Sequence, residues 1–377
     1  MAEAWRNANY QKRVEIAVQA TNIDANLSGF PALAKLADTS LSGGAGIVNA
    51  DLASKRYELY ETGNATPLAY DEESYTEGAT YANFETWVAV TTLYAAPTGD
   101  QNKVWLYYGT YDPGSDQDDA ATVWADYLAV WHMNEASGDL VDATGNGYPA
   151  ADTGTPDYQQ AAKIGYGVNL SGVDEYFEAT ADAAWDMAAA FSVEGWFKSD
   201  APTVDKRHQI YSGTDGWTLL QDDSSNLWKF FVFDGGAFDQ CDSDGAPDNN
   251  WVHIAGIREA DDTVAMYRDG ARQSDTGSRT GTITVSGSNW VIGGRYSRDG
   301  NLWDGLLDEM RIRNGLPTNH GAWFKFQHAN VNEADNELTW GSEETPSGGP
   351  TFSQLMRHQK YWDGSNFVID GVGPISM

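Results

Sequence analysis

Residues 191–199 read FSVEGWFKS and decide the fold class. Every second residue from Phe191 to Phe197 falls on one face of an extended chain, and the residues between them fall on the other. This period of two is typical of a strand in a half-buried sheet. Similar alternation recurs from one end of the sequence to the other, whereas Ala and Leu do not recur at helical spacing over any sustained window. The sequence therefore predicts an all-β protein.

Turn signals connect these short strands. Asp269-Gly270 lies between two alternating runs in VAMYRDGARQ (264–273), a pattern typical of a β-hairpin. The chain contains 15 Trp, 19 Tyr, 13 Phe and 39 Gly, a composition that suits aromatic strands joined by tight turns. Strands that recur about every 8 to 12 residues predict a β-sandwich.

Two polar, turn-rich stretches divide the chain into three parts. DPGSDQDDA (112–120) and TPSGGP (345–350) have no apolar periodicity and predict linkers. We therefore expect an N-terminal β-rich domain over 1–118, a β-sandwich over 119–344, and a linker with a C-terminal anchoring tail over 345–377.

The sandwich region resembles the laminin-G-like, concanavalin-A-like lectin family over about residues 123–344. The resemblance rests on five segments that follow one another in the family's order: 130–150, 191–199, 249–259, 264–273 and 305–315. It implies a jelly-roll sandwich with loops free to contact a partner.

The N-terminal region resembles a domain of unknown function that often precedes laminin-G-like domains in bacterial surface proteins. The matching features are Tyr10–Arg13, Phe30-Pro31, Trp87-Val88 and VWLYYG at 104–109. The C-terminal tail is loosely similar to the termini of phage structural proteins, and its Trp362-Asp363-Gly364 predicts the turn of a small hairpin.

The strongly acidic composition excludes some partners. Asp and Glu number 55 against 23 Lys and Arg, a formal net charge of −32. Nucleic acid binding requires clustered cations, so we expect no nucleic acid partner. No run of about 18 apolar residues is present, and we expect no membrane insertion. The excess charge favours solubility, and the alternative is carboxylate-rich loops that hold Ca²⁺.

A structural calcium site is the first candidate. Strict alternation in GLLDEMRIRN places Asp308 on one face with Leu306, Met310 and Ile312, where a carboxylate must be paired or metal-bound. The resemblance implies that this strand lies near the Gly-Asn-Gly loop. We therefore expect Asp142, Asn146 and Asp308 to share a Ca²⁺ ion. The alternative is that Asp308 pairs with an Arg or accepts hydrogen bonds from backbone amides.

A carbohydrate site is the second candidate. Sugar binding combines flat aromatic faces with polar groups. The stretch GGRYSRDGNLWDG (293–305) offers Arg295, Tyr296, Asp299 and Trp303 close together. Most Trp in a sandwich lie in the core, but Trp303, in a Gly- and Asp-rich loop, is expected to be exposed.

The sequence gives little support to catalysis. Glycosidases of this fold need paired carboxylates in the pattern Glu-x-Asp-x-x-Glu, which is absent. Asp308 and Glu309 are adjacent, so regular alternation would point them to opposite faces. The six His show no metal-ligand spacing such as HExxH. We expect a protein that is not an enzyme.

These features favour a structural protein of a bacteriophage virion, either a capsid decoration or a tail-associated adhesin. The N-terminal residues lack the apolar stretch of a secretory signal, and Cys241 is the only cysteine. We expect synthesis in the host cytoplasm, location in the virion, and contacts with other virion proteins or copies of itself through the tail, and with cell-surface glycans. The alternative is a bacterial cell-surface or secreted carbohydrate-binding protein, and a weaker one is a glycan-processing enzyme.

Overall fold

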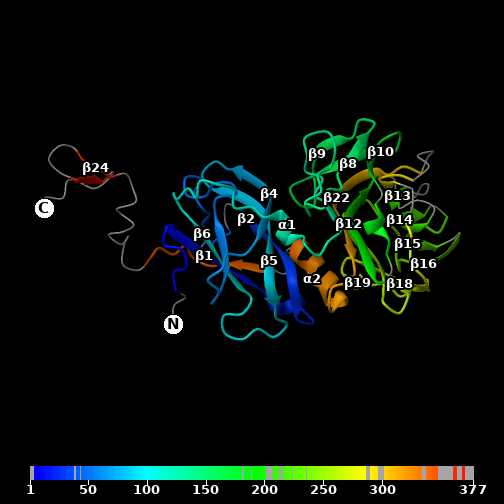
Figure 1. Cartoon of the computed structure of the whole chain (residues 1–377), viewed down its shortest axis with the longest axis horizontal. Helices are drawn as coiled ribbons and strands as arrows, with labels where there is room; N and C mark the ends of the chain where they lie inside the picture. The colour runs from blue at the N-terminus through cyan, green and yellow to red at the C-terminus, as the bar shows by residue number, and fades with distance from the viewer. Residues whose placement is uncertain are drawn as a thin grey trace.

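Two β-rich domains lie side by side in the computed structural model, and the helix over residues 320–332 lies between them (Figure 1). The structure describes residues 4–37, 40–42, 44–180, 182–187, 189–200, 207–211, 215–222, 224–234, 236–285, 289–295, 301–332, 337–346, 360–362 and 367–369. Strands dominate these residues, so the predicted all-β class is confirmed.

The N-terminal domain contains two antiparallel sheets packed on one core. In order across the first sheet, its strands are β23 (Leu338–Trp340), β1 (Lys12–Val18), β6 (Lys103–Tyr108) and β3 (Glu58–Glu61). The second sheet consists of β2 (Leu27–Leu36), β5 (Ala82–Leu93) and β4 (Tyr70–Glu77). Alternate residues of β1, namely Val14, Ile16 and Val18, enter the core between the sheets.

The second domain is a sandwich of a nine-stranded and a seven-stranded sheet. Across the larger sheet run β19 (Ala271–Arg272), β18 (Thr263–Arg268), β17 (Val252–Arg258), β12 (Phe191–Ser199), β22 (Asp304–Asn314), β10 (Tyr166–Ser171) and β9 (Asp157–Ala161), with β20 (Gly277–Ser278) paired to β18 and β7 (Ala129–Trp131) to β22. Across the smaller sheet run β16 (Ala237–Asp242), β15 (Leu227–Asp234), β14 (Gly216–Asp222), β13 (Arg207–Tyr211), β21 (Trp290–Ile292), β11 (Tyr176–Ala179) and β8 (Ala150–Thr153). Aromatic side chains from both sheets fill the space between them.

A β-bulge interrupts the alternation of β22. Glu194 on β12 pairs with Arg311 and Trp196 pairs with Asp308, so one residue of β12 opposes two of β22. Glu309, at the bulge, has a φ of 54°. The predicted face of Leu306, Asp308, Met310 and Ile312 is therefore wrong: Leu307, Met310 and Ile312 enter the sandwich core instead.

The helix α2 (His320–Asn332) packs against both domains. Phe326 lies 5.2 Å from Phe30 of β2, and Phe324 lies 5.0 Å from Tyr267 of β18, measured between ring centroids. The Asn330 side chain accepts from the backbone N–H of Leu33 and donates to its carbonyl. After this helix, β23 pairs with β1, so residues 338–340 extend the N-terminal sheet rather than the sandwich.

The stretch 112–120, expected to be a linker, lies along the N-terminal domain. Gln117 donates its backbone N–H to the Lys55 carbonyl, and Asp119 donates to the carbonyl of Tyr70 at the start of β4. Asp119 also accepts a hydrogen bond at the start of the short helix α1 (Ala120–Val123). Two 3₁₀ turns, η1 (Ala20–Asn22) and η2 (Ala183–Trp185), complete the described helical elements.

A strand pair is present where the C-terminal hairpin was predicted, while Asp363 and Gly364 of the predicted turn lie outside the described residues. β24 (Lys360–Trp362) pairs antiparallel with β25 (Phe367–Ile369), and these two strands form a sheet of their own. Figure 1 shows β24 apart from both domains. Within the described residues, no helix has the length and apolarity needed to cross a bilayer.

Candidate functional site

The outer side of the smaller sandwich sheet carries three phenylalanines, which with Gln240 we call the aromatic face: Phe231, Phe233, Phe238 and Gln240. Phe231 and Phe233 alternate with the core residues Phe230 and Val232 on β15, so their rings point away from the core. On β16, Phe238 is 58% exposed and pairs directly with Phe233. These strands lie at the end of the sandwich far from the N-terminal domain (Figure 1).

The three rings form a continuous surface. Phe231 and Phe233 are stacked, with centroids 5.8 Å apart and planes within 11°, and Phe238 lies 5.6 and 5.9 Å from them. Gly236, with a φ of 83°, adopts the left-handed conformation that the turn between the two strands requires. The plane of Phe238 is tilted by 52° and 47° against those of Phe231 and Phe233, so the hairpin holds two parallel rings and a tilted third in one apolar patch.

Polar side chains border the aromatic face. Gln240 pairs with Phe231 across the two strands, and its amide donates to Asp242 at 2.8 Å. Lys229 lies 2.8 Å from Asp222 and 3.5 Å from Asp242. The surface therefore combines aromatic rings with the side-chain amide of Gln240 and with the ammonium group of Lys229, which is ion-paired with two aspartates.

Sequence reasoning missed the aromatic face, although a signal was present. Phe230 to Phe233 read FFVF, and in a half-buried strand such a run places an aromatic ring on each side of the sheet. Phe231 and Phe233 are two residues apart and so lie on the same side of the strand, and the turn signal Asp-Gly-Gly follows them at 234–236. This combination predicts a hairpin with apolar side chains on its outer side.

Of the four predicted sugar-binding residues, Tyr296 and Asp299 lie outside the described residues. Trp303 is fully buried, so its expected exposure is wrong. Its ring packs in the sandwich core 6.0 Å from Phe197 and 5.9 Å from Trp228. Arg295 is partly buried beyond the end of β21. Trp303 thus presents no open ring face to a sugar.

Two of the three predicted calcium ligands, Asp142 and Asn146, lie in one loop and both bond to Thr144, whereas Asp308 bonds to a different loop. Asp142 uses both oxygens within its loop, accepting from Thr144 Oγ1 at 2.8 and 2.9 Å and from the backbone N–H of Tyr148. Asn146 donates to the carbonyls of Tyr127 and Leu128. Calcium bound at these residues remains a prediction.

Asp308 follows the alternative that the sequence left open. Its Oδ2 accepts from the backbone N–H groups of Lys163 and Ile164 at 3.0 and 2.9 Å. The side chain is completely buried, and burial raises its pKa well above the ordinary value, with a further contribution from Glu309. Asp308 therefore fixes the loop before β10 on the side of the sheet that faces the N-terminal domain.

A buried charged cluster occupies the junction between the two domains. His132, just after β7, places its Nε2 2.9 Å from Asp71 and its Nδ1 2.8 Å from Glu73, both on β4. Its Nδ1 also lies 2.8 Å from Glu309 on β22. Arg311 donates to Glu309 and lies over the rings of Trp87 and Trp124, 4.2 and 4.5 Å from their centroids.

The charges of this junction cluster depend on one another. Burial alone would lower the pKa of His132, but Glu309 and Glu73 raise it well above its ordinary value. Burial raises the pKa of Glu73 to about 7 in spite of the neighbouring imidazole. Burial also disfavours ionised Glu309, but His132 and Arg311 hold its pKa below the ordinary value. Opposite charges thus compensate each other where water is excluded.

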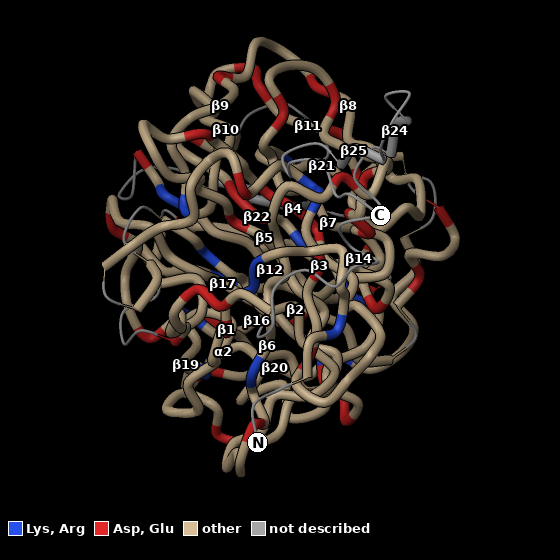
Figure 2. The backbone as a smooth tube through the Cα atoms, turned by 90° about the vertical axis from the view of Figure 1, so that its left-hand side faces the viewer, with Lys and Arg blue, Asp and Glu red and all other residues tan. Residues whose placement is uncertain are grey.

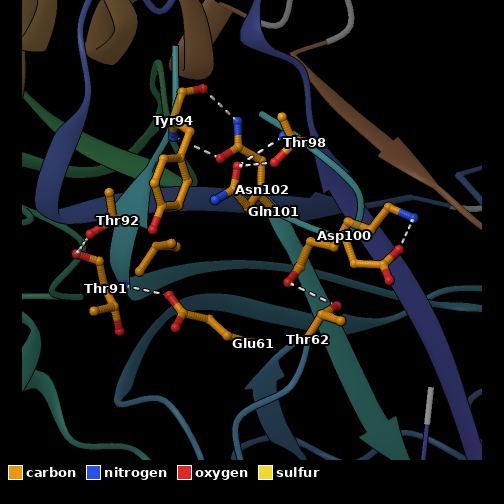
Figure 3. A pocket seen from close by; sticks show the side chains of 11 residues that line it. Glu61, Thr62, Thr91, Thr92, Tyr94, Thr98, Asp100, Gln101 and Asn102 are labelled. Carbon is orange, nitrogen blue, oxygen red and sulfur yellow. Dashed lines mark hydrogen bonds and ion pairs between the residues drawn. The ribbon is translucent and has the colours of Figure 1, made fainter. Parts of the chain in front are cut away.

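A polar pocket of about 350 Å³ opens in the N-terminal domain, beside the ends of β3 and β5 (Figure 3). Its polar groups largely bond one another: Asn102 exchanges hydrogen bonds with the backbone of Tyr94, Glu61 accepts from Thr91, and Gln101 accepts from Thr98. Tyr94 is the aromatic side chain in the lining, and it makes this pocket a second candidate for a small polar ligand.

Comparison with known proteins agrees with this fold. Residues 171–320 match the family model described as the concanavalin A-like lectin/glucanases superfamily, which confirms the predicted resemblance for the sandwich. The matched region covers β11 to the start of α2 and includes the whole aromatic face. The second domain is therefore lectin-like in its fold. No curated protein matches the chain.

Solved structures with a similar arrangement include three botulinum neurotoxin fragments. The serotype D/C VPI 5993 binding domain shares 12% identity with a TM-score of 0.43, over 56% of this chain and 53% of that chain. A structure of type C, whose cell entry depends on interaction with two ganglioside molecules, shares 13% identity with a TM-score of 0.42, over 56% and 53%.

The third fragment is the neurotoxin DC binding domain in complex with rat synaptotagmin II. It shares 12% identity with a TM-score of 0.41, over 55% of this chain and 52% of that chain. The chain thus spans about half the length of these solved structures. Similarity of this extent carries no information about ligands.

Proposed function

We propose that this chain is a non-catalytic glycan-binding protein whose lectin-like sandwich binds sugar on the aromatic face. The observation that carries the proposal is the continuous surface of Phe231, Phe233 and Phe238 on the outer side of β15 and β16. Phe238 is exposed, and Phe231 and Phe233 are half-buried beside it. Isolated apolar side chains are common at protein surfaces, whereas grouped ones mark interaction surfaces.

A sugar fits the chemistry of this surface better than a purely apolar partner. The C–H groups of a pyranose stack on aromatic rings, while its hydroxyls need donors and acceptors at the edge of the stack. Gln240 lies directly beside Phe231, and its amide supplies both functions. The Asp and Glu positions coloured along the backbone tube in Figure 2, with the net charge of −32, disfavour an anionic polymer, so we propose a neutral or cationic glycan.

The arrangement of carboxylates supports a role without catalysis. Glycoside hydrolysis needs two carboxyl groups on either side of an accessible bond. Asp308 and Glu309 are both buried at the domain junction, and Glu73 beside them is buried as well. The pocket of Figure 3 is lined by two other carboxylates, but each already has a partner: Glu61 accepts from the backbone N–H of Thr91, and Asp100 pairs with Lys103 at 3.1 Å.

For the setting we propose a bacteriophage virion, with the chain as a capsid decoration or tail-associated adhesin. The separate hairpin of β24 and β25 supports this setting, because a strand pair outside both domains suits attachment to other virion proteins or to a second copy. A bacterial cell-surface or secreted carbohydrate-binding protein is the alternative setting. Copurification with virus particles would support the first setting, and copurification with cell envelopes the second.

The experiment is a glycan array screened with the wild type and four single-residue variants. We expect binding to a restricted set of neutral or amino-sugar glycans, lost in Phe233→Ala and in Phe238→Ala. Val173→Ala, which changes a side chain 75% exposed elsewhere on the sandwich, should bind as the wild type does. Absence of binding by the wild type contradicts glycan recognition. Binding that is lost in Tyr94→Ala but kept in Phe233→Ala places the site in the pocket of Figure 3 instead.

A further inference from the structure

Three potential metal-ligand atoms meet in the buried junction cluster. The imidazole Nδ1 of His132 lies 2.8 Å from Glu309 Oε1 and 2.8 Å from Glu73 Oε2, and all three atoms lie within 4.8 Å of one another. The side chains of Glu73 and Glu309 are at most 1% exposed, and that of His132 is 9% exposed. Three donor atoms thus converge on one point away from solvent.

Each of these three side chains is held from behind by a second group. Asn134 donates to Glu73 Oε1 at 2.8 Å, and Arg311 donates to Glu309 Oε2. The Nε2 of His132 lies 2.9 Å from Asp71, which leaves Nδ1 facing the two glutamates. Metal-binding His residues characteristically direct the other ring nitrogen to a carboxylate, which fixes the tautomer and the ring orientation.

A proton alone does not satisfy this arrangement. Nδ1 of His132 can carry only one proton, and it lies 2.8 Å from both Glu309 Oε1 and Glu73 Oε2, so the two buried carboxylates compete for one donor. A hydrogen bond to one of these oxygens leaves the other incompletely bonded where water is excluded, which is unfavourable. A cation in the same place would bond to all three atoms at once.

We propose that Glu73, His132 and Glu309 bind one divalent transition-metal ion of the Zn²⁺ class. One imidazole nitrogen and two carboxylate oxygens suit Zn²⁺ or Co²⁺, whereas Ca²⁺ and Mg²⁺ prefer oxygen ligands alone. This site is distinct from the calcium ligands expected at Asp142, Asn146 and Asp308, and it does not depend on glycan binding.

The ion would join the two domains. Glu73 comes from β4 of the N-terminal domain, whereas in the sandwich His132 directly follows β7 and Glu309 lies on β22. An ion that binds the folded chain but not the unfolded chain stabilises the folded state by mass action. The metal therefore acts as a clamp that fixes how the sandwich sits on the N-terminal domain.

The test uses the full chain stripped with a chelator and then dialysed against Zn²⁺ or Co²⁺ in the presence of excess Mg²⁺. The Mg²⁺ displaces transition metal from surface carboxylates, which this acidic chain has in number. We expect one tightly held equivalent by elemental analysis, a visible Co²⁺ absorption spectrum, and a thermal midpoint that rises on loading. Glu73→Gln and Glu309→Gln should lose the equivalent, the spectrum and the rise.

Two further variants keep the test decisive. Glu77→Gln changes an exposed carboxylate on the same strand as Glu73 and should bind metal as the wild type does. Asn134→Ala leaves all three donors in place but removes the support of Glu73, and should weaken the affinity roughly 10–100-fold. A wild type that holds no metal under these conditions overturns the proposal, and so does full metal binding by folded Glu73→Gln.

Discussion

Gly195 on β12 lies opposite Glu309 at the bulge of β22, where one residue of the first strand faces two of the second. A side chain at this glycine would run into the sulfur of Met310. The bulge rotates β22 so that Asp308 and Glu309 both leave the sandwich core and face the N-terminal domain. One small residue therefore allows the strand geometry on which the whole junction cluster depends.

Substituting this glycine should destabilise the protein. We expect Gly195→Ala to lower the free energy of unfolding by about 1–3 kcal/mol, because the added methyl group overpacks the core. The measurement is denaturant unfolding followed by tryptophan fluorescence. Gly321→Ala, within α2, is the matched control. Its new methyl group would lie 3.4 Å from the hydroxyl of Tyr267 on β18, so this substitution should leave the stability unchanged or raise it slightly. Equal stabilities for the two variants would contradict the packing described at the bulge.

Two aromatic substitutions separate the core from the aromatic face. Trp303→Ala should lower the free energy of unfolding by about 3–5 kcal/mol, since a fully buried ring is removed. Phe238→Ala should change it by less than about 0.5 kcal/mol, because that ring is mostly exposed. Thermal and denaturant unfolding measure both. A Trp303→Ala protein as stable as the wild type would show that this side chain lies outside the core.

Acid stability should depend on His328 of α2. Burial lowers its pKa to about 4, with further contributions from His253 and Lys163, and its Nε2 accepts from Asn332 at 2.7 Å in the neutral form. Asp269, 3.5 Å away, does not offset these effects. Between pH 6.5 and about 4 the unfolded chain therefore binds a proton that the folded chain excludes, so stability falls as the pH falls through this window.

The corresponding measurement compares wild type with His328→Gln across that pH range. The Gln side chain keeps an acceptor for Asn332 but has no proton to gain. We expect the free energy of unfolding of the variant to fall less steeply between pH 6.5 and pH 4. Curves that run parallel throughout this window would show that the imidazole does not titrate as described.

Calcium at Asp142, Asn146 and Asp308 makes a separate prediction. Adding Ca²⁺ to metal-free protein should raise the thermal midpoint, as any ligand that prefers the folded state does. Mg²⁺ at equal concentration is the control. The rise in thermal midpoint caused by Ca²⁺ should disappear in Asp142→Asn. The stability of this variant without Ca²⁺ also changes, because Asp142 accepts hydrogen bonds from two residues of its own loop. A wild-type midpoint that ignores Ca²⁺ would exclude calcium at these residues.

The sequence predicted the fold because the fold depends on local regularities. Period-two alternation in residues 191–199 and the Asp269-Gly270 turn correspond directly to β12 and to the hairpin after β18. These patterns did not reveal backbone irregularities or contacts between residues far apart in the chain. The bulge at Glu309 breaks the alternation without any mark in the sequence, since Glu rarely adopts a positive φ.

The junction cluster could not be predicted from the sequence either, because it forms only in the tertiary structure. Glu73 and His132 are far apart in the chain, and neither belongs to a recognisable ligand motif. Only the packing of β4 against the outer side of β22 brings them together with Glu309. Trp303 was misjudged because a Gly- and Asp-rich flank predicts a loop but not the direction of a side chain within it.

Calorimetric titration with the strongest glycan from the array tests the proposed function most directly. If sugar stacks on the aromatic face, Phe231→Ala and Phe233→Ala should each weaken the affinity roughly tenfold, the loss expected for a removed stacking ring. Val173→Ala should leave the affinity unchanged. Wild-type affinity in both phenylalanine variants would contradict the account.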